Sequence, residues 1–333
     1  MTTKSFILIT SVFWALAPLT NAVAVTAGGY EGVEFFGSSQ ISRQEIEKSL
    51  GLKPGASPQQ VAKGVERLER VLSAKHLKTN VDVANDNGSI IVSVDVIPSG
   101  VESPYPTRKL KQPHHVALSS EVPFQILDEL LARREQLASN GRAVNETYPG
   151  GIKHFSDEPC DQYGDKLLQR VPGMVEELLS VVSTDPDPVR RSKAIECLNW
   201  AGEDYPTLVH TLLPAIQDSS EQVRASADRF IFPRIKMLPP DFPFEDLIEY
   251  LSLQLTRPSH MDRLLALRCL VESSKQQQIT LYAIKEYDLE RLKQLESLSI
   301  AESIKVPAHA LLQTLATLPD RPAPRAPLPI TEF

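Results

Sequence analysis

The hydrophobic pattern near the N-terminal end of the chain predicts a small sheet covered by two helices. Strands are expected at residues 30–36, 78–84 and 89–97, and the last of these has apolar residues at every second position. Between the first two strands, apolar residues recur in steps of four, three and four, which marks one buried helix face: Val61, Val65, Leu68 and Leu72. The predicted order is β-α-α-β-β, with the helices on one face of the sheet.

The stretch "LGLKPGASPQQV" predicts the end of one helix and the start of another. The first helix begins with Ser42 followed three residues later by Glu45, which is a capping box. Ser57 and Gln60 repeat that spacing after the Lys-Pro-Gly turn. Two separate helices are therefore expected, and both must pack on something apolar.

A different pattern begins near residue 166, where helical segments resemble one another. "DPDPVRRSKAIECL" and "DSSEQVRASADRFI" align so that Asp185 matches Asp218 and Arg191 matches Arg224. A weaker third copy, "MDRLLALRCL", repeats the arginine at Arg263 but lacks the aspartate. Self-similarity of this kind predicts stacked helical hairpins over residues 166–318.

The remaining segments are expected to be a leader, a linker and a tail. In residues 1–24, Lys4 is the only charge before an apolar run, and Ala22-Val23-Ala24 has the small-x-small form of a signal-peptide cleavage site. The sheet domain then spans 25–99. Residues 100–165 read as a linker with one helix, and 319–333 as a disordered, proline-rich tail. We expect an exported protein whose mature chain has no transmembrane segment.

The composition of the chain mainly excludes classes of partner and of functional site. Hydrophobic residues make up 42% of the chain and charged residues 23%, as in soluble globular proteins, and the formal net charge of -7 argues against a nucleic-acid partner. No catalytic or cofactor motif is recognised, so we expect neither. A metal site is also not expected, and neither is a disulfide among the three cysteines Cys160, Cys197 and Cys269. The alternative metal ligands are His114, His115, His154 and Cys160, which have no recognised ligand spacing.

The N-terminal domain resembles a POTRA domain, a periplasmic module of outer-membrane assembly and secretion proteins. The resemblance depends on the β-α-α-β-β order, on "GSSQIS" at the entry to the first helix, and on the "LGLKPG" turn. It implies that a partner adds a strand to the sheet edge near Val81 and Val83, by β-augmentation. The alternative is that this strand is an ordinary edge and the domain a spacer. The chain departs from the family in having no β-barrel after the module.

The C-terminal half resembles HEAT repeats over residues 166–318, through the signature "D-x-x-x-x-V-R-x-x-A". The resemblance implies a ladder of aspartates and arginines between successive repeats, formed here by Asp185, Arg191, Asp218 and Arg224. Because the third copy lacks the aspartate, the ladder is expected to stop there. The fold class is thus an α+β N-terminal domain followed by an all-α, HEAT-like solenoid.

These features together predict an exported, non-enzymatic scaffold for protein partners. The POTRA-like module would dock a strand or peptide, and the solenoid would bind a second partner. One alternative is an accessory factor in outer-membrane protein assembly or secretion, with envelope or outer-membrane proteins as partners. Another is a hydrolase with a helical lid. The POTRA resemblance favours the periplasm over the medium.

Overall fold

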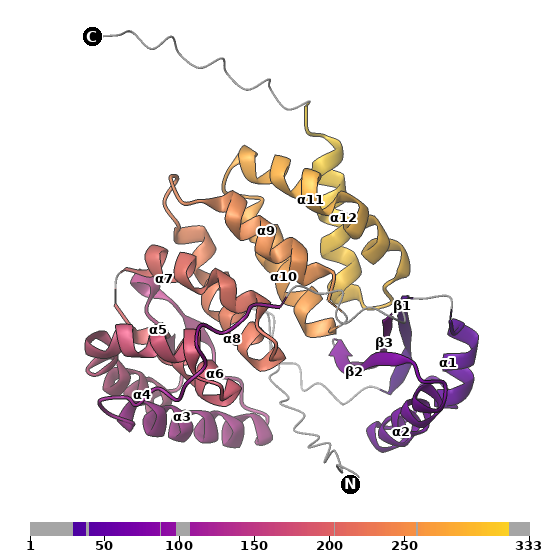
Figure 1. Ribbon diagram of the computed structural model, residues 1–333, viewed down its shortest axis with the longest axis horizontal. Helices are drawn as coiled ribbons and strands as arrows, with labels where there is room; N and C mark the ends of the chain where they lie inside the picture. The colour runs from indigo at the N-terminus through magenta and orange to yellow at the C-terminus, as the bar shows by residue number, and fades with distance from the viewer. Residues whose placement is uncertain are drawn as a thin grey trace.

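The computed structural model describes residues 29–37, 40–86, 88–97, 107–202, 204–257 and 259–319. The expected signal peptide, nearly all of the proline-rich tail and Asn87 in the predicted hairpin turn lie outside these residues. The described chain is mostly helical, with a small mixed sheet near its N-terminal end (Figure 1). In this coarser form, α+β followed by helices, the predicted fold class is confirmed.

The N-terminal sheet unit contains three strands and two helices in the order β-α-α-β-β. Its elements are β1 (Tyr30–Gly37), α1 (Arg43–Leu50), α2 (Pro58–Ala74), β2 (Lys78–Asp86) and β3 (Ser89–Ile97). The strand order in the sheet is β1-β3-β2, with β1 parallel and β2 antiparallel to the central β3. β1 and β2 are therefore the two edges.

Local signals explain where the two helices begin and where α1 ends. The Ser42 hydroxyl accepts a hydrogen bond from Glu45 N, and Glu45 Oε2 accepts one from Ser42 N at 3.0 Å. Ser57 and Gln60 make the same reciprocal pair at the start of α2. Gly51 ends α1 with a φ of 58°, in the left-handed region that glycine adopts without strain. The chain reverses between two independently capped helices.

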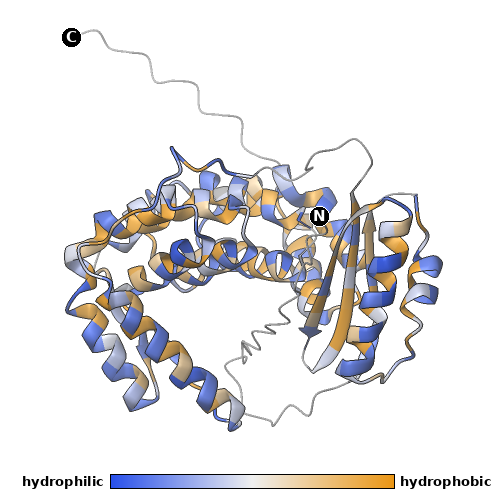
Figure 2. Ribbon diagram, turned by 60° about the horizontal axis from the view of Figure 1, so that its bottom comes forward, coloured by the Kyte–Doolittle hydropathy of each residue, from blue (hydrophilic) through white to orange (hydrophobic). Residues whose placement is uncertain are grey.

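The sheet is covered on both faces. One face packs on α1 and α2 in a wholly apolar core that includes Ile46, Leu68 and Val92. The opposite face of the central strand is also buried, although it carries polar residues: Ser93 is 1% exposed and Asp95 5%. Figure 2 shows the reason, because the sheet stands between the α1–α2 pair and the helical region. The alternating pattern of β3 correctly predicts the apolar face and gives no sign that the polar face is covered.

The helical region follows as a series of helices with one short hairpin. Its elements are α3 (Val122–Ser139), β4 (Glu146–Thr147), η1 (Pro149–Gly151), β5 (His154–Phe155), α4 (Glu158–Leu168), η2 (Val171–Met174), α5 (Val175–Thr184), α6 (Pro188–Cys197), η3 (Leu198–Trp200), α7 (Tyr205–Leu212), η4 (Leu213–Gln217), α8 (Glu221–Ile231), η5 (Phe232–Met237), α9 (Phe244–Leu255), α10 (His260–Ser273), α11 (Gln278–Leu298) and α12 (Glu302–Ala316).

These helices lie in two rows. Along one row α6 packs on α8, α8 on α10, and α10 on α12. In the other row η4 packs on α9 and α9 on α11, and each member also contacts the first row (Figure 1). One continuous hydrophobic core runs between the rows and includes Phe36 and Ile91 from the sheet. The sheet unit is therefore attached to the end of the helical region through shared core residues.

The segment that the sequence assigns to a linker contributes to this core. α3 packs against α4 and α6, and its buried side chains Phe124, Leu127 and Leu130 belong to the main core. Residues 107–120, which precede α3, lie along the helix ends of the helical region (Figure 1). We call residues 107–120 the strap.

Candidate protein-interaction surfaces

Buried arginine–aspartate pairs connect successive helices of the first row. Arg191, on α6, donates to both carboxylate oxygens of Asp218, at 3.1 and 2.7 Å. Arg224, on α8, donates to both carboxylate oxygens of Asp262, at 2.8 and 2.6 Å. All four side chains are nearly buried. Fork-to-fork pairing of this kind gives both strength and a defined geometry.

Each arginine also binds the backbone just before its own helix. Arg191 Nη1 donates to Asp185 O at 2.8 Å, and Arg224 Nη1 donates to Asp218 O at 2.9 Å. In both cases the aspartate precedes the arginine by six residues, and the arginine is the fourth residue of its helix. The same local spacing therefore produces the same contact twice. Each guanidinium joins the turn before its own helix to the carboxylate of a later segment.

The series of ion pairs continues past the point where the sequence comparison expects it to stop. The residue six positions before Arg263 is Arg257, so the aligned aspartate is indeed missing. Asp262, in the first turn of α10, supplies the carboxylate for Arg224 instead. The sequence signal for Asp262 was its place three residues after the capping Ser259, whose hydroxyl accepts a hydrogen bond from Asp262 N.

The pairing lowers the pKa of Asp218. Burial by itself raises the pKa of Asp218, but hydrogen bonds from Arg191 and Ser220 and the charge of Arg108 outweigh it, and the net pKa lies below 3.8. Asp228, on α8, lacks such a partner. Burial dominates there and raises its pKa to about 8, although a hydrogen bond from Gln254 acts in the opposite direction. Asp218, just before α8, and Asp228, on α8, are both buried, and the presence or absence of an arginine partner shifts their pKa values in opposite directions.

The strap bends at Gln112, where φ is 41°, and is held by backbone hydrogen bonds at every third residue. Arg108 N donates to Gln217 O at 2.8 Å, Lys111 N to Ser183 O at 3.3 Å, and His114 N to Thr184 O at 3.1 Å. Ser183 and Thr184 end α5, and Gln217 ends η4. Carbonyl groups at helix ends lack intrahelical partners and carry partial negative charge, so an extended basic segment suits them.

Two strap side chains reach the buried carboxylates. The Arg108 guanidinium makes two hydrogen bonds to Asp218 Oδ2, at 2.9 and 2.7 Å, so Asp218 is shared between Arg108 and Arg191. In the described part of the chain, no arginine from a preceding helix binds Asp185, although Arg190 of α6 donates to its Oδ2 at 3.1 Å. The same Oδ2 accepts from Val116 N at 3.2 Å and lies 3.3 Å from His115 Nδ1. The strap therefore covers the first two aspartates of the series.

Three carboxylates of the sheet bind the N-terminal ends of helices in the helical region. Asp82 Oδ2 accepts from His260 N, the first residue of α10, at 3.1 Å. Asp86 Oδ2 accepts from Ser303 N in the first turn of α12 at 3.2 Å. Helix N-termini carry unpaired N–H groups and partial positive charge, so each contact is favourable.

Glu34 is the most buried of the three and lies at the entry to α12. One of its oxygens accepts from the Ser299 hydroxyl and from Ile300 N and Ala301 N, while the other lies 3.9 Å from His260 Nδ1. Burial by itself raises the pKa of Glu34, but the nearby His260 and the hydrogen bonds from Ser299 and Ala301 prevail and lower that pKa to about 2. The joint between sheet and helices therefore contains specific, buried polar contacts.

The third arginine of the series ends on this joint. Arg263 is fully buried, and its guanidinium stacks on the Phe36 ring at 3.9 Å and donates to the Ser93 hydroxyl at 3.3 Å. Stacking on an aromatic face stabilises a desolvated cation. The first two arginines contact aspartates of later helices, whereas the third contacts the sheet.

The predicted docking residues on β2 differ from one another in the structure. Val81 is half-buried and packs on the core beneath α1 and α2. Val83 lies two residues further along on the same face and is 47% exposed. Among the described residues, the backbone of β2 makes hydrogen bonds to β3 alone, so its outer edge is not paired with another strand. Val83 and this edge form the accessible part of the predicted site.

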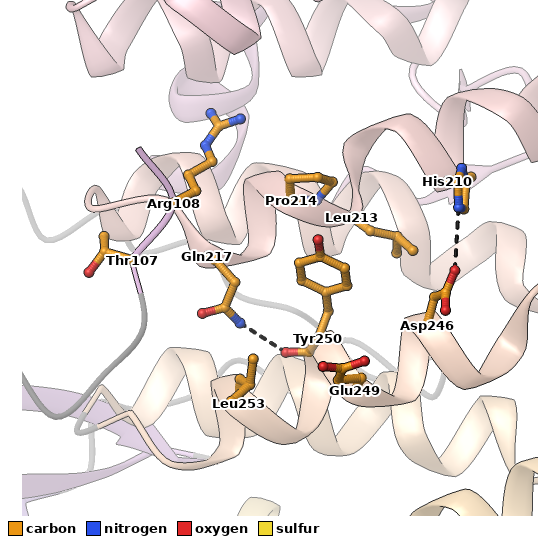
Figure 3. A pocket seen from close by; sticks show the side chains of 10 residues that line it. All are labelled: Thr107, Arg108, His210, Leu213, Pro214, Gln217, Asp246, Glu249, Tyr250 and Leu253. Atoms are coloured by element: carbon orange, nitrogen blue, oxygen red, sulfur yellow. Dashed lines mark hydrogen bonds and ion pairs between the residues drawn. The ribbon is translucent and has the colours of Figure 1, made fainter. Parts of the chain in front are cut away.

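A groove opens beside the N-terminal end of the strap, between η4 and α9. Its volume is about 510 Å³. Figure 3 shows the Tyr250 side chain in the groove between the two elements, with Arg108 at one end and His210 and Asp246 at the other. The floor is fixed by a hydrogen bond from Gln217 Nε2 to Tyr250 O at 3.1 Å. The walls of this groove come from segments far apart in the chain, so no local pattern in the sequence predicts it.

The candidate metal ligands are not brought together. His115 lies beside Asp185, His154 beside Asp161, and Cys160 is buried on α4. In the part of the chain that the structure describes, no group of three or more histidine, cysteine or acidic side chains could hold a metal ion. The three cysteines are all buried and unpaired: Cys160, Cys197 and Cys269.

No helix within the described ranges combines the length and the apolar character needed to cross a bilayer. Comparison of the chain with models of known protein families and with curated proteins finds no match.

Proposed function

We propose that the protein is an exported, non-enzymatic scaffold that binds two protein partners. A POTRA-like sheet unit would take an extended segment of one partner at the β2 edge, and a HEAT-like helical region would bind the other. The periplasm is the proposed compartment, because the leader has the layout of a signal peptide and the sheet unit has the element order of a POTRA domain.

The observation that carries the proposal is the contrast between the faces and the edge of the sheet. Both faces are covered, one by α1 and α2 and the other by the helical region. Among the described residues the outer edge of β2 is paired with no further strand, and the Val83 side chain beside it is 47% exposed. An unpaired edge strand is a template for a strand from another chain, since backbone hydrogen bonds supply the affinity.

The helical region supports the second half of the proposal. Successive helices are tied by the same arginine–aspartate contact, which is the feature that the HEAT resemblance implies. Helices stacked in two rows provide a long surface that suits extended partners. A role as an accessory factor in outer-membrane protein assembly is the second candidate, and the β-α-α-β-β order of the sheet unit favours it.

The β2 edge can be tested by photo-crosslinking in cells. A photoreactive amino acid is placed at Val83 and, as a control, at Val189, which is 44% exposed on α6. We expect a discrete crosslinked protein at position 83 and none at 189. In a second arm, Val83→Lys should abolish the product formed from a neighbouring β2 position, whereas Val189→Lys should not. Equal products at the two positions, or none at 83, would contradict the edge as a docking site.

If the crosslinked protein is an outer-membrane barrel or a secretion component, the accessory role is supported. A soluble enzyme or a cell-wall protein would instead support the general scaffold.

A further inference from the structure

The groove between η4 and α9 has the chemistry of a site for an extended basic chain. Its walls combine apolar side chains with two carboxylates, those of Asp246 and Glu249. Both acidic residues are exposed on α9. Asp246 lies 3.5 Å from His210, while Glu249 has no hydrogen-bond or ion-pair partner among the described residues. The apolar part of the lining consists of Leu213, Pro214, Tyr250 and Leu253.

The positive charge at the strap end of the groove is turned into the protein, where the Arg108 side chain is 13% exposed. Arg108 is the cationic residue at the strap end of the groove, and its guanidinium is bound to Asp218 and to Val182 O. The two carboxylates at the other end therefore dominate the charge that a ligand meets. A ligand with basic side chains is electrostatically complementary to them.

The strap is an example, within this chain, of what this side of the helical region binds. It is extended, it carries Arg108, Lys109 and Lys111, and it lies along the ends of α5 and η4. The groove begins where the strap begins, because Thr107, Arg108 and Gln217 line both (Figure 3). The strap interface and the groove are thus continuous, and a second extended segment can follow the same row of helices past α9.

We propose that this groove binds an extended, basic segment of a partner protein. A lysine or arginine of the segment would lie at Asp246 and Glu249, and an apolar side chain would pack beside Tyr250 and Leu253. The inference rests on the proposed function, since it identifies the chemistry of the partner that the helical region binds. It does not depend on the β2 edge.

The test uses the mature chain and a fluorescein-labelled peptide with the strap sequence "TRKLKQPHHVAL" as the probe. Fluorescence anisotropy should give a dissociation constant between about 10 μM and 1 mM, as for a short segment without its parent protein. The same peptide with glutamine in place of its arginine and two lysines should bind at least about tenfold more weakly.

Reversing a charge in the groove tests whether the peptide binds there. Glu249→Lys should weaken binding of the basic peptide about tenfold or more, because it puts like charges together. Glu290→Lys is the matched control, since Glu290 is 80% exposed on α11 and does not line the groove. It should leave the affinity unchanged.

Three results would overturn the inference: no binding at about 1 mM peptide, equal binding of the neutral peptide, or equal affinity for Glu249→Lys and the native chain. The last would mean that the peptide displaces the strap instead of filling the groove. None of them alters the crosslinking result at Val83, so failure of the groove and failure of the proposed edge remain distinguishable.

Discussion

The sheet unit and the helical region are stabilised by different means. Beneath α1 and α2 the core is apolar throughout, with fully buried residues such as Ile46 and Leu68. The first row of the helical region has an apolar core too, but arginine–aspartate pairs cross it at Arg191 and Arg224. Loss of apolar contact has a graded cost, whereas loss of one ion leaves an uncompensated buried charge. The helical region is therefore more sensitive to single polar substitutions.

The joint between the two regions combines both kinds of contact. Phe36 and Ile91 extend the apolar core, while Glu34, Asp82 and Asp86 bind helix N-termini. A flexible attachment would not bury Glu34 and Asp86 and hold three carboxylates in fixed geometry. The sheet unit is therefore packed firmly against the helical region, although its local sequence pattern predicts a self-contained domain.

Arg224→Met should have the largest effect. It removes the partner of buried Asp262, and we expect the free energy of unfolding to fall by about 3–5 kcal/mol. Urea denaturation followed by circular dichroism measures this change. Arg43→Met removes an exposed helical pair with Glu47 and should cost no more than about 0.5 kcal/mol. Similar losses from the two variants would show that burial does not distinguish these pairs.

Leu68→Ala should destabilise the sheet unit by about 2–5 kcal/mol, because it leaves a cavity under a fully buried side chain. Hydrogen exchange should place most of the lost protection in α1, α2 and the strands. Leu298→Ala, at a residue 49% exposed on α11, should change stability by no more than about 0.5 kcal/mol. If protection falls equally across α6 and α8, the two regions unfold together and the comparison fails.

Glu34→Gln should weaken the joint by about 1–3 kcal/mol, because the buried donors around Glu34 lose their charged acceptor. Faster exchange of the Ile300 and Ala301 amides is the direct measurement. Glu45→Gln keeps a capping box at an exposed site and should have little effect.

The pH dependence of that variant follows from the pKa of Glu34, which is lowered to about 2 in the folded chain. The ionised Glu34 side chain stabilises the folded state above the ordinary pKa near 4.5. This stabilisation is lost as the pH falls through 2. The difference between native and Glu34→Gln proteins should therefore shrink on acidification. A constant difference from pH 7 to pH 2 would contradict the ionised state of Glu34.

Asp288 should show the opposite dependence on pH. Burial on α11 raises its pKa to about 7, partly offset by a hydrogen bond from Ser252. The protonated Asp288 side chain favours the folded state fully below the ordinary pKa of 3.8. This stability is lost as the pH rises through 7, because the buried group must then ionise. Asp288→Asn should thus stabilise the protein by about 1–3 kcal/mol at pH 8 and have little effect at pH 4. Thermal unfolding at both pH values, with Glu290→Gln as an exposed control, would detect an effect of the wrong sign.

Val83→Lys should have the smallest effect on folding. Val83 lies on an edge and is 47% exposed, so the free energy of unfolding should change by no more than about 0.5 kcal/mol. Loss of partner crosslinking without loss of stability would assign the residue to docking. A destabilisation of several kcal/mol in urea denaturation would instead make it part of the core.

Elements and caps of the sheet unit are predictable because their signals are local. The pairs Ser42–Glu45 and Ser57–Gln60 act within one helical turn, and the spacing of Val61, Leu68 and Leu72 defines one buried face. The arginines at 191 and 224 are also found by comparison within the sequence. Asp262 was missed because its role depends on the packing of α8 against α10 and not on aligned spacing.

The sequence by itself determined the capped helices, the alternating strand β3 and the arginines at fixed distance from the start of each helix. Periodicity and hydrogen bonds within a few residues are sufficient for these. Tertiary structure alone decided that the polar face of the sheet is buried, that the strap lies on Asp185 and Asp218, and that a groove opens between η4 and α9. Each of these features joins residues far apart in the chain. Their charge and exposure depend on which side chains pack against them in the fold, and no local pattern encodes that packing.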